Sequence, residues 1–98
     1  MLVESHLTPA EEERLTLLEE EAAEVIQAVS KIRRFKFDGV SPKDNPKNFT
    51  NRQRLAQELA DLSLAIQLVI DNGDISSDEA NAYREGKREL LKTILKHQ

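Results

Sequence analysis

Two short acidic motifs have the residue types and the spacing of a metal-binding site. In LLEEEAAEVIQAV, residues 17–29, Glu21 and Glu24 lie three positions apart, and Glu58 and Asp61 repeat that spacing further along the chain. Residues three apart on a helix share one face, so each motif directs two carboxylates the same way. Carboxylate oxygens are hard ligands that suit Mg²⁺ or Mn²⁺. Four of them at close range repel and are poorly solvated, and a bound cation offsets both penalties.

The residues beside these motifs are small or apolar, which is unusual for a fully solvated helix face. Leu17 and Ala28 flank the first pair, and Ala65 and Leu68 flank the second. A single acidic pair in a Glu-rich helix is most often only surface charge. Two pairs on two helices, each at the edge of an apolar stripe, favour a shared site if the helices pack antiparallel. The predicted metal ligands and catalytic residues are therefore Glu21, Glu24, Glu58 and Asp61.

Three helices must position these side chains, and each begins with a local signal. The sequences Thr8 to Glu11, Thr50 to Gln53 and Ser76 to Glu79 all have the pattern of a capping box. Apolar residues then recur every three or four positions, as a helix buried on one face requires. Turn dipeptides fill the segment between the first two helices. The predicted helices span about 9–35, 51–72 and 77–97, with a loop at 36–50.

Length and composition predict the fold class. A chain of 98 residues with three Gly and three Pro, of which 33% are charged, suits a single all-α domain over residues 1–98. We expect an antiparallel helical bundle of three main helices. A domain this short has a thin core. Oligomerisation into a four-helix-type core, as a homodimer or homotetramer, is therefore expected.

Charge and composition exclude several classes of function. A net charge of −4 argues against binding a nucleic-acid polymer, which needs dense Lys and Arg. The chain has no Cys for a disulfide or thiolate site, and its two His are too far apart in sequence for a histidine metal site. The sequence shows no signal-peptide core and no apolar run long enough for a membrane. A cytoplasmic protein without membrane contact is expected.

The two motifs together resemble those of a known family. Glu20 to Glu24, EEAAE, followed by Glu58 to Asp61, ELAD, is similar to the EExxE…ExxD pattern of the MazG-like nucleotide pyrophosphohydrolases, an all-α group. The resemblance covers the first two helices, and the third helix fits the family's overall helical architecture. It implies Mg²⁺-dependent hydrolysis of nucleoside triphosphates to monophosphate and pyrophosphate, with the four carboxylates as metal ligands. The connection from Val25 to Gln57 is longer than in compact members, so base preference does not carry over.

A triphosphate substrate requires cations beyond the metal. Lys31 lies two turns beyond Glu24 on nearly the same side of the first helix. Lys87 falls within the apolar stripe of the third helix, a position that lysine usually avoids. Lys87 either reaches a phosphate, in this chain or across a dimer, or extends past the stripe to water.

Other residues are candidates for contact with the nucleotide or the metal shell. Phe35 could stack on a base or serve as a core or interface residue, and Tyr83 is a further aromatic candidate. Asn51 could bond a nucleotide or act only in the first turn of its helix. Glu20, the remaining acid of the first motif, is either an outer-shell group or solvated.

Two functions without this chemistry fit the same composition. The first is a non-catalytic helical interaction module, whose acidic residues are solvated or bind a basic partner. The second is a nucleotide-binding sensor that holds metal and triphosphate but turns over slowly. Metal-dependent stabilisation separates the first from an enzyme, and binding without turnover separates the second.

Overall fold

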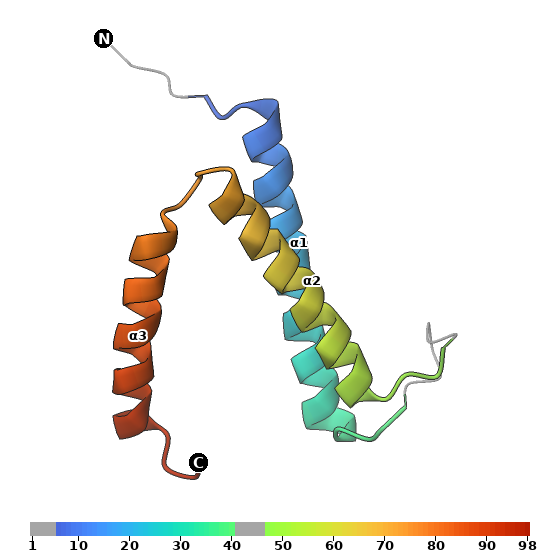
Figure 1. The fold of residues 1–98 in the computed structure, drawn as a ribbon. Coiled ribbons are helices and arrows are strands. Elements are labelled where there is room, and N and C mark those ends of the chain that lie inside the picture. The colour runs from blue at the N-terminus through green and yellow to red at the C-terminus, as the bar shows by residue number, and fades with distance from the viewer. Residues whose placement is uncertain (1–5, 41–46) are drawn as a thin grey trace.

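The computed structural model describes residues 6–40 and 47–98, and this part of the chain is all-helical (Figure 1). The helices are α1 (Pro9–Phe35), α2 (Asn51–Asp71) and α3 (Ser77–Ile94). The first two match their predicted bounds to within one residue. Outside the helices, the described segments of the predicted loop hold one isolated bridge, between Val40 and Thr50. Among the described residues, no helix is long and apolar enough to span a bilayer.

The third helix is shorter than predicted. It ends at Ile94 rather than near 97, because Leu95 leaves the helical conformation with φ −79° and ψ 118°. The backbone N–H of Leu95 still donates to the Leu91 carbonyl at 2.9 Å, which completes the last turn.

The predicted capping boxes form fully at two of the three helix starts. The Thr8 hydroxyl accepts from the Glu11 N–H at 3.1 Å, and the Glu11 carboxylate accepts from the Thr8 N–H at 2.7 Å. Thr50 and Gln53 make the same two bonds at 3.1 and 2.9 Å. At α3 only the first bond is made, from the Glu79 N–H to the Ser76 hydroxyl at 3.2 Å. The third box is therefore half formed.

Helices α1 and α2 pack antiparallel and form a hairpin (Figure 1). The buried apolar residues of the described chain are Ala28 from α1 with Ala65 and Val69 from α2. Two of these three are alanines, and small side chains let helix axes approach closely. Glu58 is buried in the same region, at 9% exposure. The hairpin core is therefore narrow, and an acidic residue occupies part of it.

The end of α1 is fixed to the start of α2 by a short hydrogen-bonded segment. The Asn51 N–H donates to the Gly39 carbonyl at 2.8 Å, and the Arg52 N–H donates to the Phe37 carbonyl at 2.8 Å. The Asn51 side-chain amide donates to the Lys36 carbonyl at 2.9 Å, and this side chain is buried. These bonds join the two helices at one end of the hairpin and, together with the packing of α1 on α2, hold their relative position.

Gly39 is required by the close approach of this segment to α1. A methyl group there would collide with the Phe35 carbonyl and crowd the Asn51 amide. We expect Gly39→Ala to lower the free energy of unfolding by roughly 1–3 kcal/mol, as overpacking does elsewhere. Gly86, in the middle of α3 with open space around it, is the matched control. Gly86→Ala should be neutral or stabilise by up to about 1 kcal/mol in urea denaturation. Equal effects at the two positions would contradict this assignment.

Helix α3 stands apart from the hairpin rather than packing into it (Figure 1). The chain leaves α2 through a turn in which Gly73 has φ +76°. Arg14 near the start of α1 holds that turn through two contacts to Asp74, at 2.6 and 2.8 Å. No residue of α3 is buried. The predicted three-helix bundle is thus not closed within one chain, and its completion by a partner stays a prediction.

Candidate metal site

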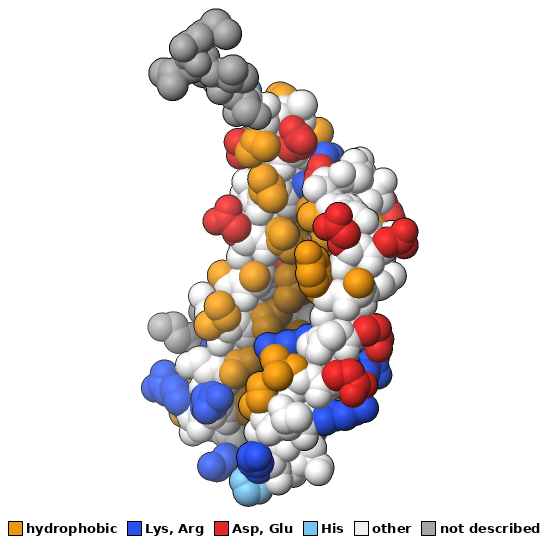
Figure 2. Space-filling model, turned by 90° about the vertical axis from the view of Figure 1, so that its left-hand side faces the viewer, with side chains coloured by type: hydrophobic (Ala, Val, Ile, Leu, Met, Phe, Trp, Pro, Cys, Tyr) orange, Lys and Arg blue, Asp and Glu red, His pale blue; other side chains and the backbone are white. Residues whose placement is uncertain are grey.

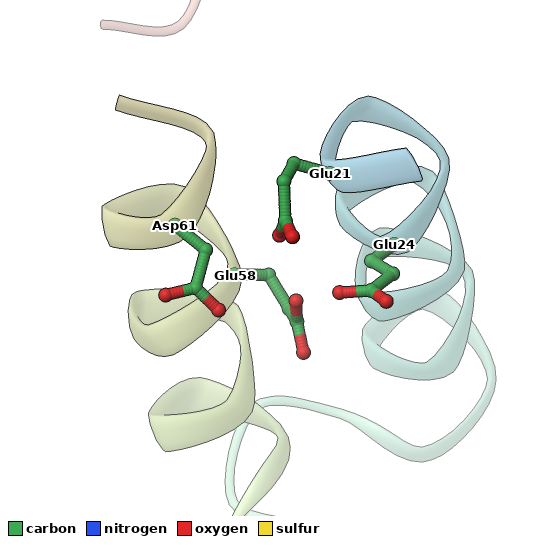
Figure 3. Close-up of side chains that lie close together, drawn as sticks. All are labelled: Glu21, Glu24, Glu58 and Asp61. Carbon is green, nitrogen blue, oxygen red and sulfur yellow. The ribbon is translucent and has the colours of Figure 1, made fainter. Parts of the chain in front are cut away.

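The hairpin brings four carboxylates together, as the spacing of the two motifs predicts. Glu21 and Glu24 come from α1, and Glu58 and Asp61 come from α2 (Figure 3). One oxygen from each of the four lies within 4.8 Å of the corresponding oxygens of the others. The antiparallel packing places the two acidic pairs at the same height, and all four side chains point into one space. We call these four residues the carboxylate cluster.

The cluster is sheltered on one side and open on the other. Glu58 is buried and Glu21 is half-buried, whereas Glu24 and Asp61 are exposed. Each helix therefore contributes one inner and one outer carboxylate. An ion held between them would contact protein on the inner side and remain reachable from solvent on the outer side.

Two oxygens in the cluster lack a partner although they are buried. They are Oε2 of Glu21 and Oε2 of Glu58, one from each helix. Buried polar atoms nearly always have a hydrogen-bond partner, and leaving one without a partner costs roughly 1–3 kcal/mol. Glu58 is more than nine-tenths buried and its carboxylate is directed into the cluster. A cation bound by the cluster would give these oxygens the partner they lack.

The electrostatics of the cluster favour a positive occupant. Burial, first, and then the neighbouring Glu24 and Asp61 carboxylates together raise the pKa of Glu58 to about 7, against a smaller opposing effect of Arg54. Burial also raises the pKa of Glu21, with Glu24 and Asp61 adding to the shift. In both residues the charged form is disfavoured, so Glu58 is partly protonated near neutral pH and a bound metal would displace that proton.

The donor set determines which ion would fit. All four side chains offer carboxylate oxygens, which match hard divalent cations such as Mg²⁺ and Mn²⁺. The cluster contains no His and the chain contains no Cys, so the nitrogen and sulfur ligands preferred by zinc and copper are missing from it. The residues present therefore fit a Mg²⁺ or Mn²⁺ ion.

Cationic residues lie beside the cluster. A hollow of about 210 Å³ is lined by Glu24 and Glu58 of the cluster together with Gln27, Ala28, Lys31 and Arg54. Lys31 lines this hollow on the same side of α1 as Glu24, as its spacing of two turns beyond Glu24 predicts. Sequence reasoning did not single out Arg54 or Gln27. A signal for Arg54 was available, because it precedes Glu58 by four residues and therefore lies one turn away on the same face of α2.

The structure does not bring the other substrate candidates to this hollow. Phe35 is about half exposed at the end of α1, with the Arg34 guanidinium 5.0 Å from its ring. Asn51 is buried, and its side-chain amide donates a hydrogen bond to the Lys36 carbonyl. Asn51 therefore helps to connect α1 to α2 and does not face the cluster.

The two candidates on α3 are also away from the cluster. Tyr83 is 75% exposed. Lys87 lines a separate hollow on α3 with Arg84, Arg88 and Leu91. Both lie apart because α3 does not pack on the hairpin. Glu20 is exposed on α1, where its charge adds a small part to the raised pKa of Glu21.

Comparisons of this chain with protein families, with curated proteins and with solved structures find no match. A function for the carboxylate cluster must therefore be inferred from the chemistry of its own residues and of the cations beside them.

Proposed function

We propose that this protein hydrolyses nucleoside triphosphates to the monophosphate and pyrophosphate in a Mg²⁺-dependent reaction, with Mn²⁺ as a possible substitute. The observation that carries the proposal is the carboxylate cluster, in which a buried, unpartnered glutamate oxygen from each helix faces two exposed carboxylates. The motif resemblance described above points to the same reaction. The substrate class is inferred from the cations beside the cluster, which suit an anionic ligand that also binds metal.

The burial of the four carboxylates suggests one role for the inner pair and another for the outer pair. Glu21 and Glu58 form the inner side and would anchor the ion. Glu24 and Asp61 are exposed and would hold it on the side from which substrate and water arrive. When bound, Mg²⁺ neutralises phosphate charge and lowers the pKa of its water ligand.

Lys31 and Arg54 would bind the phosphate groups that the metal does not neutralise. Both line the hollow that continues from Glu24 and Glu58, one from each helix. Guanidinium and ammonium groups donate charge-assisted hydrogen bonds to phosphate oxygens. Phosphoryl transfer depends mainly on such positioning and charge stabilisation. These two residues would fix the triphosphate chain relative to the metal.

The direct test is a screen for pyrophosphate release over ribo- and deoxyribonucleoside triphosphates with Mg²⁺, using Asp61→Asn as the inactive control. Release of pyrophosphate rather than phosphate supports the proposal, and an inert protein on every nucleotide with either Mg²⁺ or Mn²⁺ contradicts it. Nucleotide binding without turnover would instead indicate a sensor. The absence of any stabilisation by metal would indicate a non-catalytic interaction module.

Arg54→Gln should raise KM for the nucleotide by roughly 10- to 100-fold, since one charged hydrogen bond contributes about 1.5–3 kcal/mol. Arg52→Gln is the matched control. Arg52 lies two residues away, is exposed, and faces Asp38 at 3.5 Å and the Phe37 ring instead of the hollow. Steady-state kinetics should show an unchanged KM for Arg52→Gln. Similar KM values for the two variants would remove Arg54 from the substrate site.

A further inference from the structure

The end of the hairpin where α1 finishes and α2 begins differs in composition from the rest of the chain. It comprises the described residues 31–40 and 47–54, and we call it the basic–aromatic end (Figure 1). These 18 residues include all three Phe of the chain, one Asp and seven basic residues, which are Lys31, Arg33, Arg34, Lys36, Lys47, Arg52 and Arg54. Their formal net charge is +6. Because the whole chain carries −4, its other residues together carry −10.

The net charge of the chain is therefore an average over two regions of opposite sign. Figure 2 shows this segregation, with Lys and Arg gathered in the lower part of the view, where α1 and α3 both end, and mostly Asp and Glu in the upper part. Salt screens exposed charges beyond about 10 Å, so a polyanion near the basic–aromatic end responds mainly to the local charge. The expectation that this chain binds no nucleic-acid polymer rests on the average and does not describe this end.

The positive charge of the basic–aromatic end is almost uncompensated within the chain. Six of its seven basic residues are exposed, and Arg54 is half-buried. Among the described residues, the one ion pair at this end joins Arg52 to Asp38 at 3.5 Å, with both side chains exposed. Arg33 and Arg34 offset the negative end of the α1 dipole, whereas the first turn of α2 holds no acid to offset its positive end.

The Phe rings at this end are all stacked with cations. Each ring has a cationic group 4.6 to 5.6 Å from its centroid, and the pairs are Arg34 with Phe35, Arg52 with Phe37, and both Lys47 and Arg54 with Phe49. Phe35 and Phe37 are 53% and 45% exposed. Aromatic faces and positive charge are therefore presented together on an accessible surface.

The backbone that carries Phe37 is held in place by the start of α2. The Arg52 N–H donates to the Phe37 carbonyl at 2.8 Å, and the buried Asn51 side chain donates to the Lys36 carbonyl at 2.9 Å. These bonds fix the segment before any ligand arrives. Binding to a surface that is already ordered costs less conformational entropy.

We propose that the basic–aromatic end binds a single strand of nucleic acid, DNA or RNA. Proteins that bind single strands without reading their sequence combine a cationic surface for the phosphates with aromatic side chains on which the bases stack. Arginine adds cation–π contacts to the same bases. This surface shares Lys31 and Arg54 with the hollow beside the carboxylate cluster and otherwise lies beyond it. The proposal does not depend on the proposed hydrolase activity.

An anionic membrane is the other partner that basic and aromatic residues can suit, and the geometry disfavours it. A helix that lies on a membrane presents an apolar stripe along its length. Here Phe35 ends α1, Phe37 lies in the connecting segment, and Phe49 precedes the start of α2. The helices therefore reach this surface with their ends rather than their sides (Figure 1). The cation over each ring would also have to leave it before the ring entered lipid.

Fluorescence anisotropy with a labelled oligo-dT or oligo-U of about 12 nucleotides tests the proposal. EDTA is included so that a metal in the carboxylate cluster cannot hold the phosphates. We expect binding whose log K falls with log[salt] with a slope of about −2 to −4, which corresponds to roughly three to six phosphate contacts. Inorganic polyphosphate, which has the charge but no bases, should compete more weakly. Absence of binding at about 50 mM salt, or equal competition by polyphosphate, would overturn the proposal.

Two substitutions separate stacking from charge. Phe37→Leu keeps the apolar bulk but removes the aromatic face, and it should weaken binding by roughly 5- to 150-fold without changing the salt slope. Arg34→Gln should make the slope shallower by about 0.7, the value for one phosphate contact. The matched controls are Tyr83→Leu and Arg88→Gln on α3, where Tyr83 is 75% exposed and Arg88 pairs with Glu85 at 3.4 Å. Both controls should bind as the wild type does.

Wild-type affinity in Phe37→Leu, or an equal loss in Tyr83→Leu, would show that the bases do not stack at this end. Tighter binding to vesicles of phosphatidylcholine and phosphatidylserine than to the oligonucleotide would overturn the proposal in favour of a membrane surface. Circular dichroism reports whether each variant remains helical. The comparison of oligonucleotide with polyphosphate uses the wild type, so it decides the question even if a variant unfolds.

Discussion

Replacing Asp61 with asparagine is expected to reduce pyrophosphate release by more than about 100-fold. Loss of a residue that only hydrogen-bonds to a metal ligand typically costs roughly 10- to 100-fold, and Asp61 is itself a proposed ligand. The substitution keeps the shape of the side chain and removes its charge. Asp61 is exposed, so the hairpin should fold normally. What changes is the charge that the cluster offers to a divalent cation. Activity should fall together with the affinity for Mg²⁺, measured by pyrophosphate release and by metal titration.

Asp71→Asn is the matched control for that experiment. Asp71 is the last residue of α2, and its carboxylate accepts a bond from the Gln67 amide at 2.7 Å instead of facing the cluster. It should retain wild-type activity and metal affinity. If Asp61→Asn keeps activity, or both variants lose it equally, the cluster is not the catalytic site.

The metal-free protein is expected to lose stability as pH rises from about 4.5 to 7, because Glu58 is buried. Its pKa is about 7 in the folded state, against an ordinary value of 4.5. Below 4.5 the carboxyl is protonated in both states, and its contribution to stability is fully present. Between 4.5 and 7 the folded state binds more protons than the unfolded state, so each increment of pH favours unfolding. A shift of this size corresponds to a loss of about 3 kcal/mol.

Added Mg²⁺ should reverse that loss, and by more at higher pH, since metal must displace the retained proton. The measurement is thermal unfolding from about pH 5 to 8 with and without Mg²⁺. Glu58→Gln should flatten the pH profile and abolish the Mg²⁺ response. Glu19→Gln, at an exposed position of α1, should leave both unchanged. A wild-type profile without pH dependence, or stabilisation by Mg²⁺ that survives in Glu58→Gln, would show that Glu58 is not a buried ligand.

The sequence alone was enough to locate the helices, because the signals that begin and end them are local. Thr8 and Thr50 cap with hydrogen bonds to residues three positions on, and Gly73 takes the positive φ of the turn after α2. The i, i+3 pairing of the acidic residues is equally local, since one helical turn fixes it. The four carboxylates could therefore be chosen from spacing, given antiparallel packing.

Only the tertiary structure decided which of these carboxylates is buried and what surrounds them. Glu58 is buried, while Asp61 one turn later is exposed. Arg54 and Lys31 line the same hollow because α1 and α2 pack antiparallel, with Asn51 bonded to the end of α1 at the start of α2. The turn between α2 and α3 is likewise held by contacts between residues far apart in the chain, Arg14 and Asp74. Burial and contacts between helices depend on residues far apart in the chain, and the periodicity of a single helix holds no information about them.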